Sequence, residues 1–129
     1  MKRSESQSLH LKQMEAQLLP FRALGAVPRP VGGWIRAVRQ ALGLSLKAVA
    51  EPMKVSPQEI HRIEKAESIG SVSLRLIEAT ADAMGCRVVY AIVPKNGTLT
   101  DLSKESGGHA IRASLHSMAL EGQGVEKPI

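Results

Sequence analysis

The chain is poor in aromatic residues and in cysteine. Only Phe21, Trp34 and Tyr90 are aromatic among its 129 residues, so any core must be aliphatic. Small helical domains are often built this way, whereas a deep ligand pocket usually has an aromatic lining, and we expect no small-molecule substrate and no cofactor. The single cysteine, Cys86, excludes an internal disulfide and fits a reducing, cytoplasmic compartment. Because Cys86 begins an apolar run, we expect it to be buried.

Long apolar runs are also missing. No stretch approaches the ~20 apolar residues that a membrane span needs, so we expect no membrane contact. The first eight residues, MKRSESQS, are not followed by an apolar segment, and we expect no signal peptide. A chain of this length can build one modest domain with arms rather than two full cores.

Charge is unevenly distributed along the chain. The formal net charge is +5, and residues 1–43 carry seven Lys or Arg against two acids, whereas the remainder is balanced. A basic segment ahead of a helical domain suits contact with phosphate groups. A charge this small is equally typical of a solvated, soluble surface.

Composition predicts three segments. Residues 1–32 form an amphipathic helix over 4–19, stopped by Pro20, and a linker rich in Gly and Pro. Residues 33–94 form the main domain. Residues 95–129 form a weakly helical tail that Gly107 and Gly108 interrupt.

The main domain shows four short helical patterns. The first buries a stripe of apolar residues and ends near Gly43, and this stripe consists of Trp34, Ile35, Val38 and Leu42. Ser45 is placed to cap the second helix, and Ser56, followed by Pro57, to cap the third. Ser71 or Ser73 caps the fourth, which closes at Gly85.

A strand is expected after these helices. Residues 87–93 are rich in β-branched side chains and Pro94 ends the run. No second convincing strand is present, and a lone strand cannot satisfy its own backbone hydrogen bonds. We therefore expect it to pair with a second copy of the chain, forming a homodimer, or with another protein.

The segment Leu44–Lys65 has the spacing of a helix-turn-helix. The small residue Ala50 lets the two helices approach, Val55 lies in the turn, and Ile60 and Ile63 bury the second helix against the first. The predicted fold class is mainly α: a lambda-repressor-like helix-turn-helix bundle with one added C-terminal β-strand and with helical arms at both ends.

This arrangement predicts contact with double-stranded DNA. Gln58 could recognise adenine and Arg62 guanine from the start of the second helix. Glu59, His61 and Lys65 also point outward or toward the helix start. Ser45, Lys47 and Ser56 stand where side chains and helix starts touch phosphates. The alternative is a helical hairpin in a bundle that binds no nucleic acid.

The segment at about residues 33–85 resembles the Xre-type, or Cro-like, helix-turn-helix domains. Over nearly the whole chain the sequence resembles the family called mobile mystery protein A, through GWIRAVRQALGLSLKAVA, VSPQEIHRIEKAE, LRLIEATADAMGCRVVYAIVP and HSMALEGQ. Members of that family typically travel with a Fic-domain partner, an AMP-transferring protein. The resemblance implies the antitoxin half of a toxin–antitoxin pair.

Several positions depart from the usual pattern. Pro52 falls inside the second helix, where proline removes a hydrogen bond and kinks the chain. Lys54 stands where glycine is usual in the turn, so we expect backbone strain there. Leu46 and Pro57 replace the Gln residues with which many Xre-type domains contact DNA.

The tail holds a second pattern, S-x-x-x-E-G, at Ser117, Glu121 and Gly122. It resembles the inhibitory helix of Fic antitoxins. Ser and Glu four residues apart share one helix face, and the carboxylate can pair with an arginine that otherwise binds ATP phosphate. Such a short pattern also arises by chance.

Other chemistry is poorly represented. The four histidines have no metal-ligand spacing, and one cysteine adds no zinc site. No Ser/His/Asp arrangement can be inferred, and nothing argues for an enzyme. Two functions remain open: an antitoxin-like DNA-binding regulator that also inhibits a Fic-domain toxin, and a stand-alone Xre-type transcriptional repressor.

Overall fold

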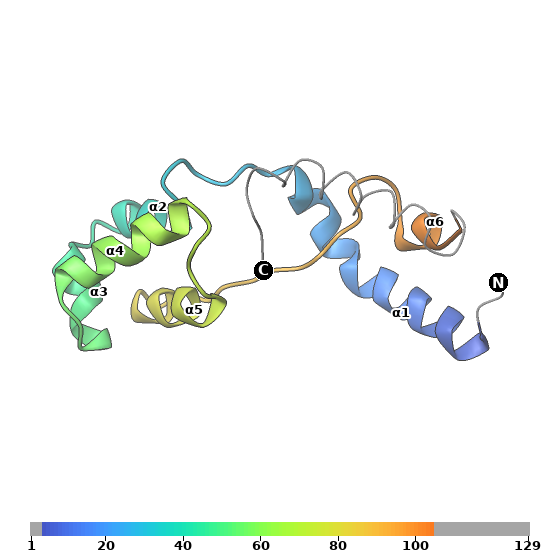
Figure 1. Cartoon of the computed structure of the whole chain (residues 1–129), viewed down its shortest axis with the longest axis horizontal. Helices are drawn as coiled ribbons and strands as arrows, with labels where there is room; N and C mark the ends of the chain where they lie inside the picture. Colours follow the sequence, from blue (N-terminus) through green and yellow to red (C-terminus); the bar gives the residue numbers. More distant parts are fainter. Residues whose placement is uncertain (1–3, 105–129) are drawn as a thin grey trace, which may run out of the picture. The chain divides into compact units, whose positions relative to one another are not determined.

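The computed structural model describes residues 4–104, and the regular secondary structure of these residues is helical. The elements in chain order are α1 (Glu5–Arg22), η1 (Ala23–Ala26), α2 (Trp34–Ala41), α3 (Leu46–Met53), α4 (Pro57–Ser68), α5 (Leu74–Ala83) and α6 (Leu99–Lys104) (Figure 1). They fall into two compact units. Residues 27–90, with α2 to α5, form one; residues 4–26 and 91–104, with α1 and α6, belong to the other.

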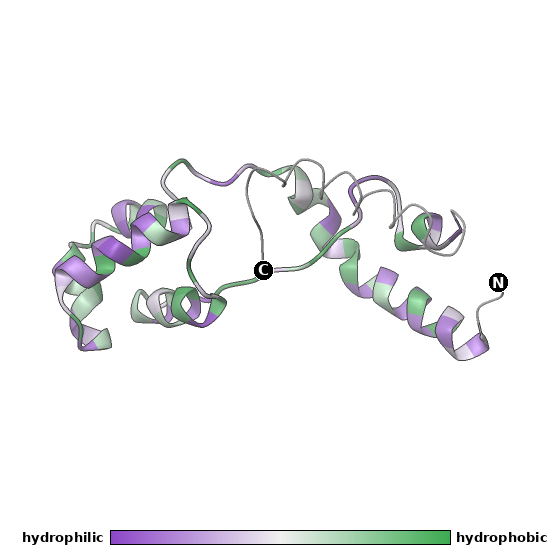
Figure 2. Cartoon of the chain, in the orientation of Figure 1, coloured by the Kyte–Doolittle hydropathy of each residue, from purple (hydrophilic) through white to green (hydrophobic). Residues whose placement is uncertain are grey.

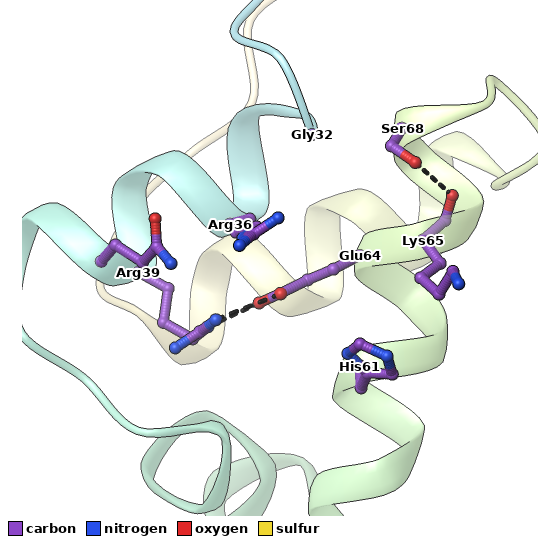
Figure 3. A pocket seen from close by; sticks show the side chains of 8 residues that line it. Gly32, Arg36, Arg39, His61, Glu64, Lys65 and Ser68 are labelled. Carbon is purple, nitrogen blue, oxygen red and sulfur yellow. Dashed lines mark hydrogen bonds and ion pairs between the residues drawn. The ribbon is translucent and has the colours of Figure 1, made fainter.

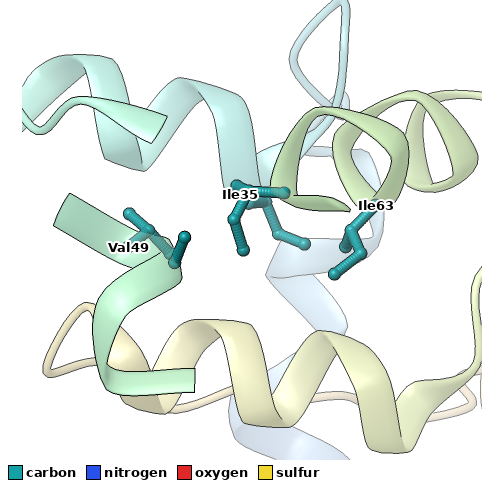
Figure 4. Close-up of a cluster of buried hydrophobic side chains, with 5 residues drawn as sticks. Ile35, Val49 and Ile63 are labelled. Atoms are coloured by element: carbon teal, nitrogen blue, oxygen red, sulfur yellow. The ribbon is translucent and has the colours of Figure 1, made fainter. Parts of the chain in front are cut away.

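The core of the first unit is small and aliphatic. It consists of Ile35, Val49, Ala50, Ile60 and Ile63, each at most 2% exposed (Figure 4). Helices α2, α3 and α4 each contribute to it, and side chains of α5 pack against its edge. The expected packing of α4 on α3 through Ala50, Ile60 and Ile63 is confirmed.

Serine residues start three helices of this unit. The hydroxyl oxygens of Ser45, Ser56 and Ser73 accept hydrogen bonds from the backbone N–H three residues later, at 3.0–3.1 Å. These bonds satisfy N–H groups that have no partner inside the helix. The predicted caps at Ser45 and Ser56 are confirmed, and Ser73 rather than Ser71 caps α5.

The turn between α3 and α4 contains the strained residue that the sequence predicted. Lys54 adopts the left-handed conformation with φ of 59°, and it is the only non-glycine residue with positive φ in the described part of the chain. Pro52 does not interrupt α3, which continues to Met53. Since Pro52 lies one residue from the helix end, its missing N–H affects only the last turn.

Three residues expected inside are exposed. Trp34 is 47% and Leu42 54% exposed, and Cys86 is also exposed. Because α2 has only eight residues and ends before Leu42, Ile35 is its one buried side chain. The expected burial of Cys86 is wrong because the segment after α5 does not enter the core.

The expected strand is absent from the described residues. Residues 87–93 form no regular secondary structure, since no other described segment pairs with them. Their side chains are largely open to solvent: Val89, Tyr90 and Ile92 are 66%, 67% and 88% exposed.

The second unit is loosely packed. Helix α1 extends through Pro20 to Arg22, beyond the stop that the sequence predicted. Because Pro20 lies in the last turn, its missing N–H removes a hydrogen bond only near the helix end. It contains polar and apolar residues along its length (Figure 2) and buries none of them. Glu15 accepts a hydrogen bond from the Thr100 N–H at 2.7 Å, which ties α1 to the start of α6.

Candidate nucleic-acid interface

Two residues of α4 point directly away from the core. Gln58 and Arg62 each lie two positions from the fully buried Ile60, which places them about 160–200° around the helix from it. Both are exposed, and the side chain of Arg62 is 68% accessible. This is the orientation in which a recognition helix presents side chains to a DNA groove.

The flank of α4 adds further polar groups. His61 and Lys65 are exposed, about 100° and 140° around the helix from Ile60. Together with Gln58 and Arg62 they form one continuous outward face, which we call the α4 outer face. Among the α4 residues that the sequence predicted to contact DNA, only Glu59 and the cap Ser56 lie outside the α4 outer face.

Glu59 binds Arg62 before any ligand is present. The Arg62 guanidinium donates two hydrogen bonds to the Glu59 carboxylate, one of them from Nε at 3.0 Å. This pairing lowers the pKa of Glu59 and raises that of Arg62. The guanidinium is therefore oriented and partly neutralised by Glu59, and any other partner of Arg62 would compete with this carboxylate.

The predicted phosphate contacts lie at two helix starts. Ser45, Lys47 and Ser56 are exposed, at the beginning of α3 and of α4. Both serine hydroxyls already accept a backbone hydrogen bond, but a hydroxyl can still donate its proton to a phosphate oxygen. These three residues and the α4 outer face belong to the same compact unit.

A buried ion pair positions α4, and no local pattern in the sequence indicated this pair. Arg39 of α2 donates to the Glu64 carboxylate at 2.6 and 3.2 Å, and to the Leu44 carbonyl oxygen at 3.0 Å. The two side chains are only 13% and 4% exposed. One guanidinium thus connects α2, α4 and the loop that leads into α3.

A second buried carboxylate fixes the start of α2. Glu67 of α4 accepts hydrogen bonds from the backbone N–H groups of Trp34 and Ile35 at 2.8 and 2.9 Å. No side chain caps α2 locally, because Gly33 precedes it. Helix α2 begins after Gly-Gly and has no Ser, Thr, Asp or Asn at its start to accept a hydrogen bond. This missing cap is the sequence signal that could have indicated an acceptor from elsewhere in the chain.

The described residues hold no group of three or more His, Cys, Asp or Glu that could bind a metal ion. Nor does any helix within residues 4–104 have the length and apolarity to cross a membrane. The tail pattern at Ser117, Glu121 and Gly122 lies outside the described residues.

Comparison with known families agrees with this architecture. Residues 31–88 match the family model described as a helix-turn-helix domain. This range contains α2 to α5 and the whole α4 outer face. The chain therefore contains a helix-turn-helix domain, the domain type of DNA-binding regulators. No match was found among the curated proteins or among the solved structures.

Proposed function

We propose that this protein is a transcriptional regulator that binds double-stranded DNA in a sequence-dependent way through the α4 outer face. The supporting observation is that Gln58 and Arg62 are exposed directly opposite the buried Ile60. A glutamine can bond both polar atoms of an adenine edge, and an arginine can bond both acceptors of guanine. Such a regulator would act in the cytoplasm, beside the chromosome.

Binding-site selection from a random duplex library tests this proposal. We expect the wild-type protein to enrich a defined sequence and to bind it with strong salt dependence. Arg62→Ala should lose the preference at one base pair, worth about 1–3 kcal/mol. Arg87→Ala, an exposed arginine outside this face, is the matched control. Failure of the wild-type protein to enrich any sequence would overturn the proposal.

We further propose that the regulator works as a homodimer, because two α4 helices would read a two-fold operator. Leu9 and Leu19 of α1 are 56% and 62% exposed, and Val89, Tyr90 and Ile92 are more exposed still. Burial of this apolar surface against a second copy of the chain would lower the free energy and so favour a dimer. Sedimentation of the wild-type protein and of a Leu9→Glu/Leu19→Glu variant tests this: a wild-type monomer at micromolar concentration would contradict it.

A second function is inhibition of a Fic-domain toxin by the tail, and its support is the sequence alone. Ser117 and Glu121 match the inhibitory pattern, and the family resemblance implies a Fic-domain partner. Glu121→Gly should release toxin activity when both proteins are produced together, whereas Glu126→Gly, the matched tail control, should not. Unchanged inhibition by the Glu121 variant would leave the stand-alone repressor as the remaining function.

A further inference from the structure

A pocket of about 340 Å³ lies between α2 and α4, at the flank of the α4 outer face (Figure 3). Its lining contains no apolar side chain, and consists of Gly32, Arg36, Arg39, Gln40, His61, Glu64, Lys65 and Ser68. A pocket for a drug-like molecule is lined mainly by hydrophobic and aromatic side chains. Here every lining side chain ends in a charged or hydrogen-bonding group, which favours a charged ligand.

The pocket carries an excess of positive charge. Glu64 is its only carboxylate, and both oxygens of that group are already bonded to Arg39. Within the described residues no ion pair engages Arg36 or Lys65. Two full positive charges from two different helices therefore face the same space, with His61 and Gln40 as additional hydrogen-bonding groups.

We propose that this pocket receives a phosphate group of the DNA backbone, so that α2 forms part of the DNA interface. The inference rests on the proposed function and extends it to two residues of α2, Gln40 and Arg36, the latter one of the basic residues of segment 1–43. An arginine guanidinium can hold two phosphate oxygens at once, and a lysine ammonium adds a point charge.

The geometry of α4 supports this assignment. Gln58 and Arg62 point straight away from the core, whereas His61 and Lys65 lie on the flank that turns toward α2. When the outward side chains face base edges in a groove, the flank faces the sugar-phosphate edge of that groove. The buried Arg39–Glu64 pair holds the floor of the pocket in place between the two helices.

The salt dependence of DNA binding tests the pocket directly. Each phosphate contact contributes a slope of about −0.9 to the plot of log affinity against log salt concentration. We expect Arg36→Gln and Lys65→Gln each to make this slope shallower by about one, and to weaken binding to the selected duplex and to a scrambled duplex by the same factor. Arg87→Gln removes the same charge outside the pocket and should leave the slope unchanged.

The outcomes separate the pocket from the proposed function. A wild-type slope for Arg36→Gln, or an equal loss in the Arg87→Gln control, overturns the pocket proposal while sequence-dependent binding stands. A wild-type protein that prefers no duplex overturns both. Thermal unfolding followed by circular dichroism must give matching midpoints for the variants compared. If Arg36→Gln unfolds, the slope of Lys65→Gln, which removes the other free charge of the pocket, decides the test.

The phosphate could also come from a free molecule, and a second arm distinguishes this source. Inorganic phosphate and adenosine monophosphate are titrated into the isotope-labelled protein while the amide signals of Arg36 and Lys65 are followed. We expect only weak, non-saturating shifts. Saturation at micromolar concentration, together with displacement of DNA, would assign the pocket to a free phosphate compound and overturn the backbone contact.

Discussion

The guanidinium of Arg39 contacts the carboxylate of Glu64 at 2.6 Å, across the interface between α2 and α4. Both side chains are nearly inaccessible to solvent, and Arg39 additionally bonds the Leu44 carbonyl oxygen. Helix α4 of this small domain is thus held by electrostatics as well as by its aliphatic core. A core of five buried residues leaves little other means of fixing the angle between these helices.

Removing one member of this pair should destabilise the domain strongly. We expect Glu64→Ala to lower the free energy of unfolding by about 3–5 kcal/mol, because the Arg39 charge would remain buried without a counter-ion. Urea denaturation measures this. Glu59→Ala removes the partner of the exposed Arg62 and should cost less than about 1 kcal/mol. Equal losses in the two variants would contradict the role given to the buried pair.

Gly33 should tolerate no side chain. Its φ is +93°, and a Cβ atom there would lie 2.6 Å from Oε1 of Glu67, which caps α2. Gly33→Ala therefore combines backbone strain with loss of two capping hydrogen bonds, and should cost more than about 2 kcal/mol. Gly43→Ala is the control, since Gly43 also has positive φ but nothing within 4 Å of the added carbon. Thermal unfolding of the two variants isolates the contribution of the clash.

Replacing Lys54 by glycine should stabilise the domain. Lys54 lies in the left-handed region, which costs a non-glycine residue about 1–2 kcal/mol of backbone strain. Glycine removes this strain, but it loses more backbone entropy on folding, which offsets part of the gain. We expect Lys54→Gly to raise the free energy of unfolding by about 0.5–1 kcal/mol. Glu51→Gly, in the exposed part of α3, should instead lower it by about 1 kcal/mol. A loss in both variants would show that Lys54 is not strained.

Neutralising Glu59 should strengthen binding to DNA. The variant Glu59→Gln releases Arg62 and removes a negative charge near the phosphates, so we expect affinity to rise about twofold to fivefold. Fluorescence anisotropy with a labelled duplex measures this change. Glu78→Gln alters the same charge on the exposed surface of α5 and should have a smaller effect. A rise no greater than that of the control would contradict competition between Glu59 and DNA for Arg62.

Acid should loosen the contact between α1 and α6. The Thr100 N–H holds the pKa of Glu15 below its usual 4.5, so the contact stabilises this unit above that pH and is lost as pH falls through the lowered value. The Thr100 amide resonance should shift over this range at low pH. In Glu15→Gln the shift should vanish, whereas in the control Glu5→Gln it should persist. A Thr100 signal that titrates identically in all three proteins would refute the contact.

Local sequence determined the helices of the domain, the caps of α3 and α4, and the inward face of α4. Ser45, Ser56 and the pair Ile60 and Ile63 could be recognised because capping and helical periodicity depend on residues three or four positions apart. The outward placement of Gln58 and Arg62 follows from the same periodicity. It required no knowledge of the rest of the chain.

Tertiary structure alone decided what lies between the helices. Arg39 and Glu64 are 25 residues apart, and Ile35 and Glu67 are 32 apart, so no local rule pairs them. The failed prediction of a strand at 87–93 has the same origin, because β-structure requires a partner that a β-prone composition does not supply. Helical hydrogen bonds close within one segment, whereas ion pairs, pockets and strands need a second segment that only the folded chain brings near.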